Sequence, residues 1–155
     1  DFCYQAVEVI QNPDLAGAKV VVIGGGDLGC ETAELLLDKG KKVSLVEVLP
    51  ELLPRTKTLP RAELLSRLQE KNLEIYTEYN ASAITPGSIT IVNKSGASFT
   101  LPADTVVFAT GVEPNRPLYH ELQGKVKEVY LVGDVEEPGN VGHALRTALK
   151  VALAL

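Results

Sequence analysis

The sequence predicts an α/β fold: a parallel sheet with helices on both faces and a three-stranded antiparallel meander attached to it. Short, continuous apolar runs that end in glycine are typical of strands buried on both faces of a parallel sheet. Segments with a 3.6-residue apolar period lie between these runs and predict helices. Between residues 81 and 101 the apolar residues instead alternate, and Pro-Gly and Ser-Gly pairs break the segment into hairpins.

The first half of the chain contains a strand, a glycine-rich turn, a helix and a second strand. A helix over Tyr4 to Gln11 and a linker are expected within residues 1–18. A buried strand follows over Lys19 to Ile23, and the helix runs from Leu28 to Lys39, where Gly40 stops it. The second strand is Lys42 to Glu47, so the segment has the length of a βαβ unit.

The second half adds a helix, two more buried strands, the meander and a closing helix. Residues 19–111 are expected to form one domain that contains the meander at 81–101, and residues 112–155 belong to a second domain. Right-handed crossovers give the sheet the order 3-2-1-4-5. The later elements are a helix at 61–71, strands at 73–76, 105–109 and 129–132, meander strands at 81–85, 89–93 and 98–101, and a helix at 141–155.

Composition excludes several classes of function. The chain has 155 residues, 45% of them hydrophobic, and a net charge of −5. Its Lys and Arg residues are scattered, so no nucleic-acid partner is expected. No apolar stretch approaches the ~20 residues that span a bilayer, so no membrane partner is expected. Cys3 and Cys30 form no disulfide framework, which favours the cytoplasm. Both ends of the chain suggest a segment of a longer polypeptide.

The glycine turn predicts dinucleotide binding in a Rossmann-like domain. Gly24 permits the sharp turn, Gly26 lets the backbone approach a pyrophosphate, and Gly29 lets the helix pack on the strand. Gly25, Asp27 and Leu28 lie between these glycines and complete the candidate cofactor-binding turn. The N–H groups and positive dipole end of the helix then face the phosphates.

Glu47 selects the dinucleotide. It ends the second strand, with Val48 beside it, about twenty residues after the turn, where a carboxylate accepts hydrogen bonds from both ribose hydroxyls of adenosine. A 2′-phosphate about 4 Å away would be repelled by ~4 kcal/mol at an effective dielectric near 20. No Arg follows in residues 48–50, so the prediction is NADH rather than NADPH. The alternative is that Glu47 is only a solvated strand end.

Two acidic residues of the helix have less certain roles. Asp27 is expected to cap the N-terminus of the helix rather than to bind the cofactor. Glu31 lies one turn further along the helix. It is placed to reach a nicotinamide ribose or carboxamide, or merely to complement the helix dipole, and the sequence leaves both interpretations open.

Two motifs near the C-terminus identify a family. Ala109, Thr110 and Gly111 begin an A-T-G-x-x-P-N stretch, and Gly133 and Asp134 follow an apolar run. With the glycine turn and the meander, they resemble the pyridine nucleotide-disulfide oxidoreductase superfamily of two-dinucleotide-fold flavoprotein reductases. The sequences G-G-G-D-L-G-C-E and V-E-V-L-P-E are most similar to the C-terminal NADH/FAD region of old-yellow-enzyme-like NADH:flavin oxidoreductases, a group that includes enoate and dienoyl-CoA reductases.

The resemblance implies a role in electron entry. Hydride would pass from NADH to FAD in the intact protein, for reduction of an activated C=C substrate of the 2-enoate or dienoyl-CoA type. The glycine turn and Glu47 would hold NADH, Gly111 would lie near the junction of the cofactors, and Asp134 would contact FAD; without the other motifs, Asp134 would be only a polar strand cap. The first half of the FAD domain, and a barrel with FMN and an iron–sulfur cluster, would lie upstream. The exposed surface left by that half could drive a homodimer.

Other functions fit less well. A regulatory NAD-binding module without redox chemistry remains the alternative, although it has no reason to carry the two C-terminal motifs. Short-chain dehydrogenases need a Tyr-x-x-x-Lys pair, and none of the five tyrosines has Lys at that spacing. Neither His120 nor His143 has partners at the spacing of metal ligands. No catalytic residue is assigned, and the segment alone is expected to be inactive.

Overall fold

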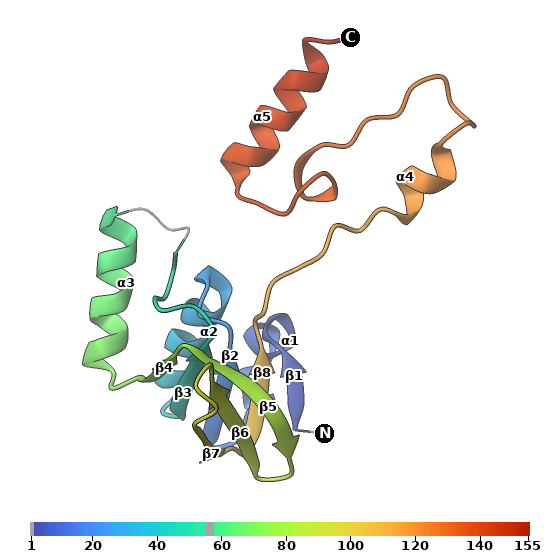
Figure 1. Cartoon of the computed structure of the whole chain (residues 1–155). Helices are drawn as coiled ribbons and strands as arrows, with labels where there is room; N and C mark the ends of the chain where they lie inside the picture. Colours follow the sequence, from blue (N-terminus) through green and yellow to red (C-terminus); the bar gives the residue numbers. More distant parts are fainter. Residues whose placement is uncertain (1, 55–57) are drawn as a thin grey trace. The chain divides into compact units, whose positions relative to one another are not determined.

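The chain forms two compact units, Asp1–Gly111 and Val112–Leu155. The structure is a computed structural model, and it describes residues 2–54 and 58–155. Figure 1 shows the first unit, with its strands and helices, in blue to yellow and the second unit in orange to red.

The first unit contains a parallel five-stranded sheet, as predicted. Its strand order is β1-β8-β2-β3-β4. In the centre, Val22 of β2 pairs with Leu45 of β3 and with Val107 of β8. All three side chains are fully buried, which explains why these strands have continuous apolar sequences. The strand bounds are β1 Cys3–Gln5, β2 Lys19–Ile23, β3 Lys42–Glu47, β4 Glu74–Thr77 and β8 Thr105–Phe108.

Helices cover one face of this sheet. They are α1 Ala6–Gln11, α2 Asp27–Asp38 and α3 Thr58–Glu70, with a short 3-10 turn, η1, at Pro13–Leu15. Their buried side chains, among them Val9, Leu36 and Leu68, form one core with Val20 and Leu45 of the sheet. The helix expected at 61–71 is therefore present and begins three residues earlier.

The antiparallel meander covers the other face. Its strands are β5 Tyr79–Thr85, β6 Ser88–Asn93 and β7 Ser98–Pro102, in the order β5-β6-β7. Ile89, Ile91 and Leu101 pack against Val21 and Val106 of the parallel sheet. Figure 1 shows these three strands gathered on one side of the first unit. The meander prediction is confirmed, but the prediction of helices on both faces is wrong here, because a second sheet occupies that position.

The strand at the sheet edge also differs from the prediction. The expected order 3-2-1-4 is confirmed by β4-β3-β2-β8, but the fifth place belongs to β1, where Tyr4 pairs with Val107. The helix expected over Tyr4 to Gln11 thus begins only at Ala6. A three-residue strand is too short to show a pattern of its own, and its pairing with β8 decides its conformation. Residues 129–132 form no strand in the described part of the chain.

The second unit is built from helix α4 Pro117–Leu122, the short 3-10 turn η2 Gly133–Val135 and helix α5 Val141–Ala152. Pro117 starts α4 at its first turn, where proline is well tolerated. Arg116 donates from Nε to the Val135 carbonyl at 2.8 Å and from Nη2 to the Glu136 carbonyl. These bonds tie the start of α4 to the turn that carries Asp134. Within the described ranges, no helix is both long and apolar enough to cross a membrane.

Candidate dinucleotide-binding site

The glycine turn joins β2 to α2 at the carboxyl end of the parallel sheet. The Gly24 N–H donates to the Val46 carbonyl of the neighbouring strand at 2.8 Å. The backbone at Gly24 has φ of +111°, a conformation that residues other than glycine rarely adopt. In addition, a Cβ built on Gly24 would lie 2.4 Å from the Ala109 carbonyl oxygen. Gly24 is therefore required both by the turn and by the close approach of β8.

The other glycines of the turn have different surroundings. A Cβ on Gly29 would lie only 1.8 Å from the Gly24 carbonyl oxygen, so α2 can approach the turn only with glycine there. A Cβ on Gly25 would lie 2.5 Å from Leu52 Cδ2. At Gly26, by contrast, a Cβ would meet nothing within 4 Å. Gly26 thus borders open space, which is the geometry expected where a backbone receives an external group.

Helix α2 presents its N-terminus at this open position. Gly26 is the N-cap and Asp27 is the first helical residue, so the prediction that Asp27 caps the helix is wrong. Gly26 has the extended backbone conformation of an N-cap but no side chain, and Leu28 and Gly29 follow in the first turn. A first helical turn leaves N–H groups without intrahelical acceptors, and these groups attract anions. Glu31 is exposed on the next turn of α2.

Glu47 lies beside the turn, at the end of β3. It is only 8% exposed, so it is not a solvated strand end. Its Oε2 accepts from the Gly25 N–H at 2.5 Å and its Oε1 accepts from the Leu49 N–H at 2.7 Å. A carboxylate oxygen has two lone pairs, so each oxygen can accept one further hydrogen bond. The side chain is therefore fixed in position and keeps acceptor capacity for a diol.

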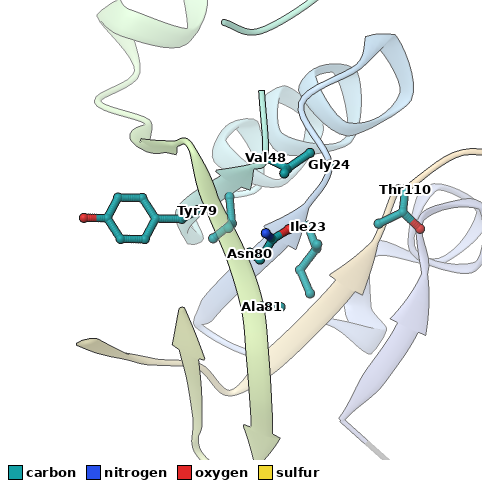
Figure 2. Close-up of a pocket in the computed structure, with 8 residues that line it drawn as sticks. Ile23, Gly24, Val48, Tyr79, Asn80, Ala81 and Thr110 are labelled. Atoms are coloured by element: carbon teal, nitrogen blue, oxygen red, sulfur yellow. The ribbon is translucent and has the colours of Figure 1, made fainter. Parts of the chain in front are cut away.

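A pocket of about 140 Å³ adjoins the turn. It lies between the carboxyl ends of β2, β3 and β8 on one side and the start of β5 on the other (Figure 2). Figure 2 shows Thr110 at the end of β8 and the Tyr79 ring pointing away from the other labelled residues. The residues that line the pocket are Ile23, Gly24, Val46, Val48, Tyr79, Asn80, Ala81 and Thr110.

Three residues of β5 were missed by sequence reasoning: Tyr79, Asn80 and Ala81. Alternation along the meander indicates a strand but does not show which end of the strand reaches the glycine turn. The strand also begins two residues before its predicted start, at Tyr79. The missing information is tertiary, because these residues reach the site only when the meander folds over the parallel sheet.

Cys30 packs beneath the glycine turn. Its side chain is fully buried, and its Sγ lies 3.5 Å from the Gly25 carbonyl oxygen. Burial raises the pKa of the Cys30 thiol to about 12, and the negative charges of Asp27, Glu47 and Glu31 add to this shift. Such a thiol is unreactive, which agrees with a small packing residue. The residues that the structure describes contain no group of three or more His, Cys, Asp or Glu that could hold a metal ion.

The residues of the two C-terminal motifs lie in different units. Ala109, Thr110 and Gly111 end the first unit, and Gly111 has φ of +111° with open space at its Cβ position. Gly133 and Asp134 lie in η2 of the second unit, where Asp134 Oδ1 accepts from the Gly139 N–H at 3.1 Å. The Gly133 N–H donates to Thr147 Oγ1 of α5 at 2.8 Å.

Comparison with known proteins places this geometry in a family. The model of the family described as pyridine nucleotide-disulphide oxidoreductase matches residues 3–148. Similar proteins include the bilirubin reductase of Mediterraneibacter gnavus, 36% identical over 134 residues, which are 86% of this chain and 21% of that protein. The cinnamate reductase of Clostridium sporogenes is 30% identical over 155 residues, 98% of this chain and 23% of that protein.

A solved structure supports the fold. The complex of 2-naphthoyl-CoA reductase with 2-naphthoyl-CoA matches with a TM-score of 0.88 at 22% identity, over 100% of this chain and 24% of that chain. This chain thus spans about a quarter or less of the length of these proteins. Because the family model covers nearly the whole chain, the chain belongs to the pyridine nucleotide-disulphide oxidoreductase family.

Proposed function

We propose that this chain is the NADH-binding segment of a flavin-dependent oxidoreductase, in which hydride passes from NADH to FAD. The observation that carries the proposal is the open backbone at Gly26, at the N-terminus of α2, beside the buried carboxylate of Glu47. This arrangement offers N–H donors to a pyrophosphate and acceptors to a ribose diol within one site. Family membership supports the use of a pyridine nucleotide and a flavin.

Each part of the site has a role in holding the nucleotide. The first turn of α2, with Gly26, Asp27, Leu28 and Gly29, surrounds the pyrophosphate, and Glu47 accepts from the adenosine ribose. Its negative charge disfavours a 2′-phosphate, which favours NADH over NADPH. The pocket beside Gly24 and Val48 gives the nucleotide an apolar wall, and Ala109, Thr110 and Gly111 continue this wall at the end of β8. We assign Glu31, which is exposed on α2, to the nicotinamide half; the alternative is that it only complements the helix dipole.

FAD binding needs more residues than this chain supplies. Asp134 Oδ1 already accepts one hydrogen bond from Gly139, and its remaining lone pairs can accept from a ribityl or ribose hydroxyl. The sequence has one G-x-G-x-x-G turn, which we assign to NADH. The phosphates of FAD would thus be held by an upstream half of the FAD domain. When bound, FAD supplies the chemistry of hydride acceptance.

One of the relatives supports a substrate class for the intact protein. Cinnamate is a 2-enoate, and the similarity to a cinnamate reductase supports reduction of an activated C=C bond by the intact protein. A barrel with FMN and an iron–sulfur cluster upstream would complete the electron path. We place the protein in the cytoplasm on the basis of its cysteine pattern.

The proposed upstream half has a surface to cover in the second unit. Helix α5 exposes a row of apolar side chains at four-residue spacing: Val141 is 76% exposed, Leu145 66% and Leu149 59%. Side chains at this spacing share one helix face. An apolar face of this extent is typical of an interface, so the isolated chain is expected to form a homodimer through it when the upstream half is absent.

Two experiments test the proposal. Calorimetric titration of the 155-residue chain with NADH should show one site, and Gly26→Ala should weaken it. Failure of the chain to bind NADH would overturn the assignment. In the full-length protein, NADH added without oxygen should bleach the flavin absorbance. Nucleotide binding without bleaching would instead support the regulatory alternative.

A further inference from the structure

The Glu47 carboxylate joins the glycine turn to the segment that follows β3. We propose that Glu47 is a positioning residue as well as a nucleotide ligand: it holds the glycine turn and residues 48–54, here called the strap, in the binding conformation before any nucleotide arrives. The proposal rests on the proposed function only for the identity of the ligand. Its structural basis is the pair of hydrogen bonds from Gly25 and Leu49 to the two carboxylate oxygens.

The peptide groups of Gly25 are held from both sides. Its N–H donates to Glu47, and its carbonyl oxygen accepts from the Leu53 N–H at 2.8 Å. Leu52 packs its side chain directly on the Gly25 Cα and is only 5% exposed. The turn therefore depends on the strap for its shape, and Glu47 links the two at the other end of the strap.

Leu53 shows that the strap is under constraint. Its φ of +54° lies in the left-handed region, which leucine rarely adopts, and its side chain is 1% exposed. A residue keeps such a conformation only when its surroundings determine it, and strained residues of this kind gather at ligand sites. The strap is held by the Leu53 N–H bond to the Gly25 carbonyl, by the Arg61 Nε bond to the Leu52 carbonyl at 3.0 Å, and by the Leu49 N–H bond to Glu47. Loss of the Glu47 bonds should let the strap relax away from the turn.

The two hydrogen bonds require a side chain with two acceptor oxygens at position 47. Both oxygens accept from backbone N–H groups, so both must be acceptors. A glutamine has one acceptor oxygen and one NH₂ group. In either orientation its NH₂ would face a backbone N–H, and one of the two bonds would be lost. Glu47→Gln, which keeps the shape of the side chain, is therefore expected to open one end of the strap.

Amide hydrogen exchange of the nucleotide-free chain, followed by NMR, tests the proposal. In the wild-type chain the Gly25, Leu49 and Leu53 amides should exchange slowly. Glu47→Gln should speed exchange at one or more of them by about tenfold or more, with the Val21 amide in β2 as the internal reference. The matched control Glu74→Gln, on the exposed side of the neighbouring strand β4, should leave all four unchanged. Unchanged exchange at all three amides, Gly25, Leu49 and Leu53, in Glu47→Gln would overturn the proposal.

Two further measurements test the proposal independently of the Glu47→Gln variant and separate it from the proposed function. If Glu47→Gln does not fold, the NMR chemical shift of the Gly25 amide proton in the nucleotide-free wild-type chain tests the proposal. A short hydrogen bond to a carboxylate should move this chemical shift far downfield. A chemical shift in the ordinary amide range would overturn the proposal. NADH titration of the wild-type chain is independent of both. If Glu47 protects the turn but NADH does not bind, the positioning role stands and the proposed function fails.

Discussion

Replacement of Glu47 by alanine should remove most of the discrimination between NADH and NADPH. The carboxylate is 8% exposed and is fixed by Gly25 and Leu49, so it cannot swing away from a 2′-phosphate. Two like charges about 4 Å apart, at an effective dielectric near 20, repel by ~4 kcal/mol. Since 1.4 kcal/mol corresponds to a factor of ten, the wild-type chain should prefer NADH by up to about a thousandfold.

The ratio of the two dissociation constants is the quantity to measure. Glu47→Ala should weaken NADH binding, because it removes both a ribose ligand and the bonds that hold the glycine turn. The second effect applies equally to NADPH and cancels in the ratio. The ratio therefore reports the direct contacts of the carboxylate alone, which are its hydrogen bond from the 2′-hydroxyl of NADH and its repulsion of the 2′-phosphate of NADPH. In Glu47→Ala the ratio should fall to within about tenfold.

Fluorescence titration with the two reduced nucleotides, at low and high salt, measures this ratio. Glu74→Ala removes an exposed carboxylate from the neighbouring strand and should leave the ratio unchanged. Repulsion between partly buried charges is weakly screened, so the wild-type preference should largely survive high salt. A wild-type chain that binds NADPH as tightly as NADH, or a Glu47→Ala chain that keeps the full preference, would refute the reasoning.

Three further predictions concern the turn, the thiols and α5. Gly26→Ala should leave thermal stability unchanged and weaken NADH binding about tenfold, because its Cβ enters only the open space. Gly29→Ala should instead destabilise the fold by about 1–3 kcal/mol in urea denaturation, since its Cβ meets the turn; equal behaviour of the two variants would contradict both assignments. At pH 8 a thiol with a pKa of about 12, such as that of Cys30, is ionised in about one molecule in ten thousand. Iodoacetamide should therefore modify the exposed Cys3 in the folded chain and reach Cys30 only after unfolding. Intact-mass measurement should show one adduct on the folded chain and two on the unfolded chain. Leu145→Glu should shift the isolated chain from dimer to monomer in sedimentation velocity without loss of helix, and an unchanged dimer would exclude α5 as the interface.

Local sequence patterns predicted much of the first unit. The strand, glycine turn and helix from Lys19 to Asp38 could be predicted because apolar periodicity and glycine positions are local signals. The meander could be predicted for the same reason, since Gly87 and Gly96 with positive φ mark its two turns. These elements also place Glu47 beside the glycine turn, so the central geometry of the candidate site follows from the sequence.

Features that depend on tertiary contacts could not be predicted in this way. The β1 strand exists because β8 offers it a partner, and the meander covers a sheet face that could equally have taken a helix. The Glu47 bonds to Gly25 and Leu49 require β3, the turn and the strap to meet, and nothing in the spacing of these residues shows that both oxygens are used. Sequence patterns thus identified Glu47 but not its link to the strap.

The strand predicted at residues 129–132 failed for a different reason. Its apolar pattern is real, yet Tyr130 is 45% exposed and Val132 is 41% exposed. A buried strand needs neighbours that take its hydrogen bonds and cover its side chains, and the described part of the second unit contains no sheet. Helix α5 likewise has apolar side chains, those of Val141, Leu145 and Leu149, that are exposed rather than buried. We infer that both apolar segments are buried only in the assembled protein that we propose, in which the upstream half of the FAD domain supplies the sheet.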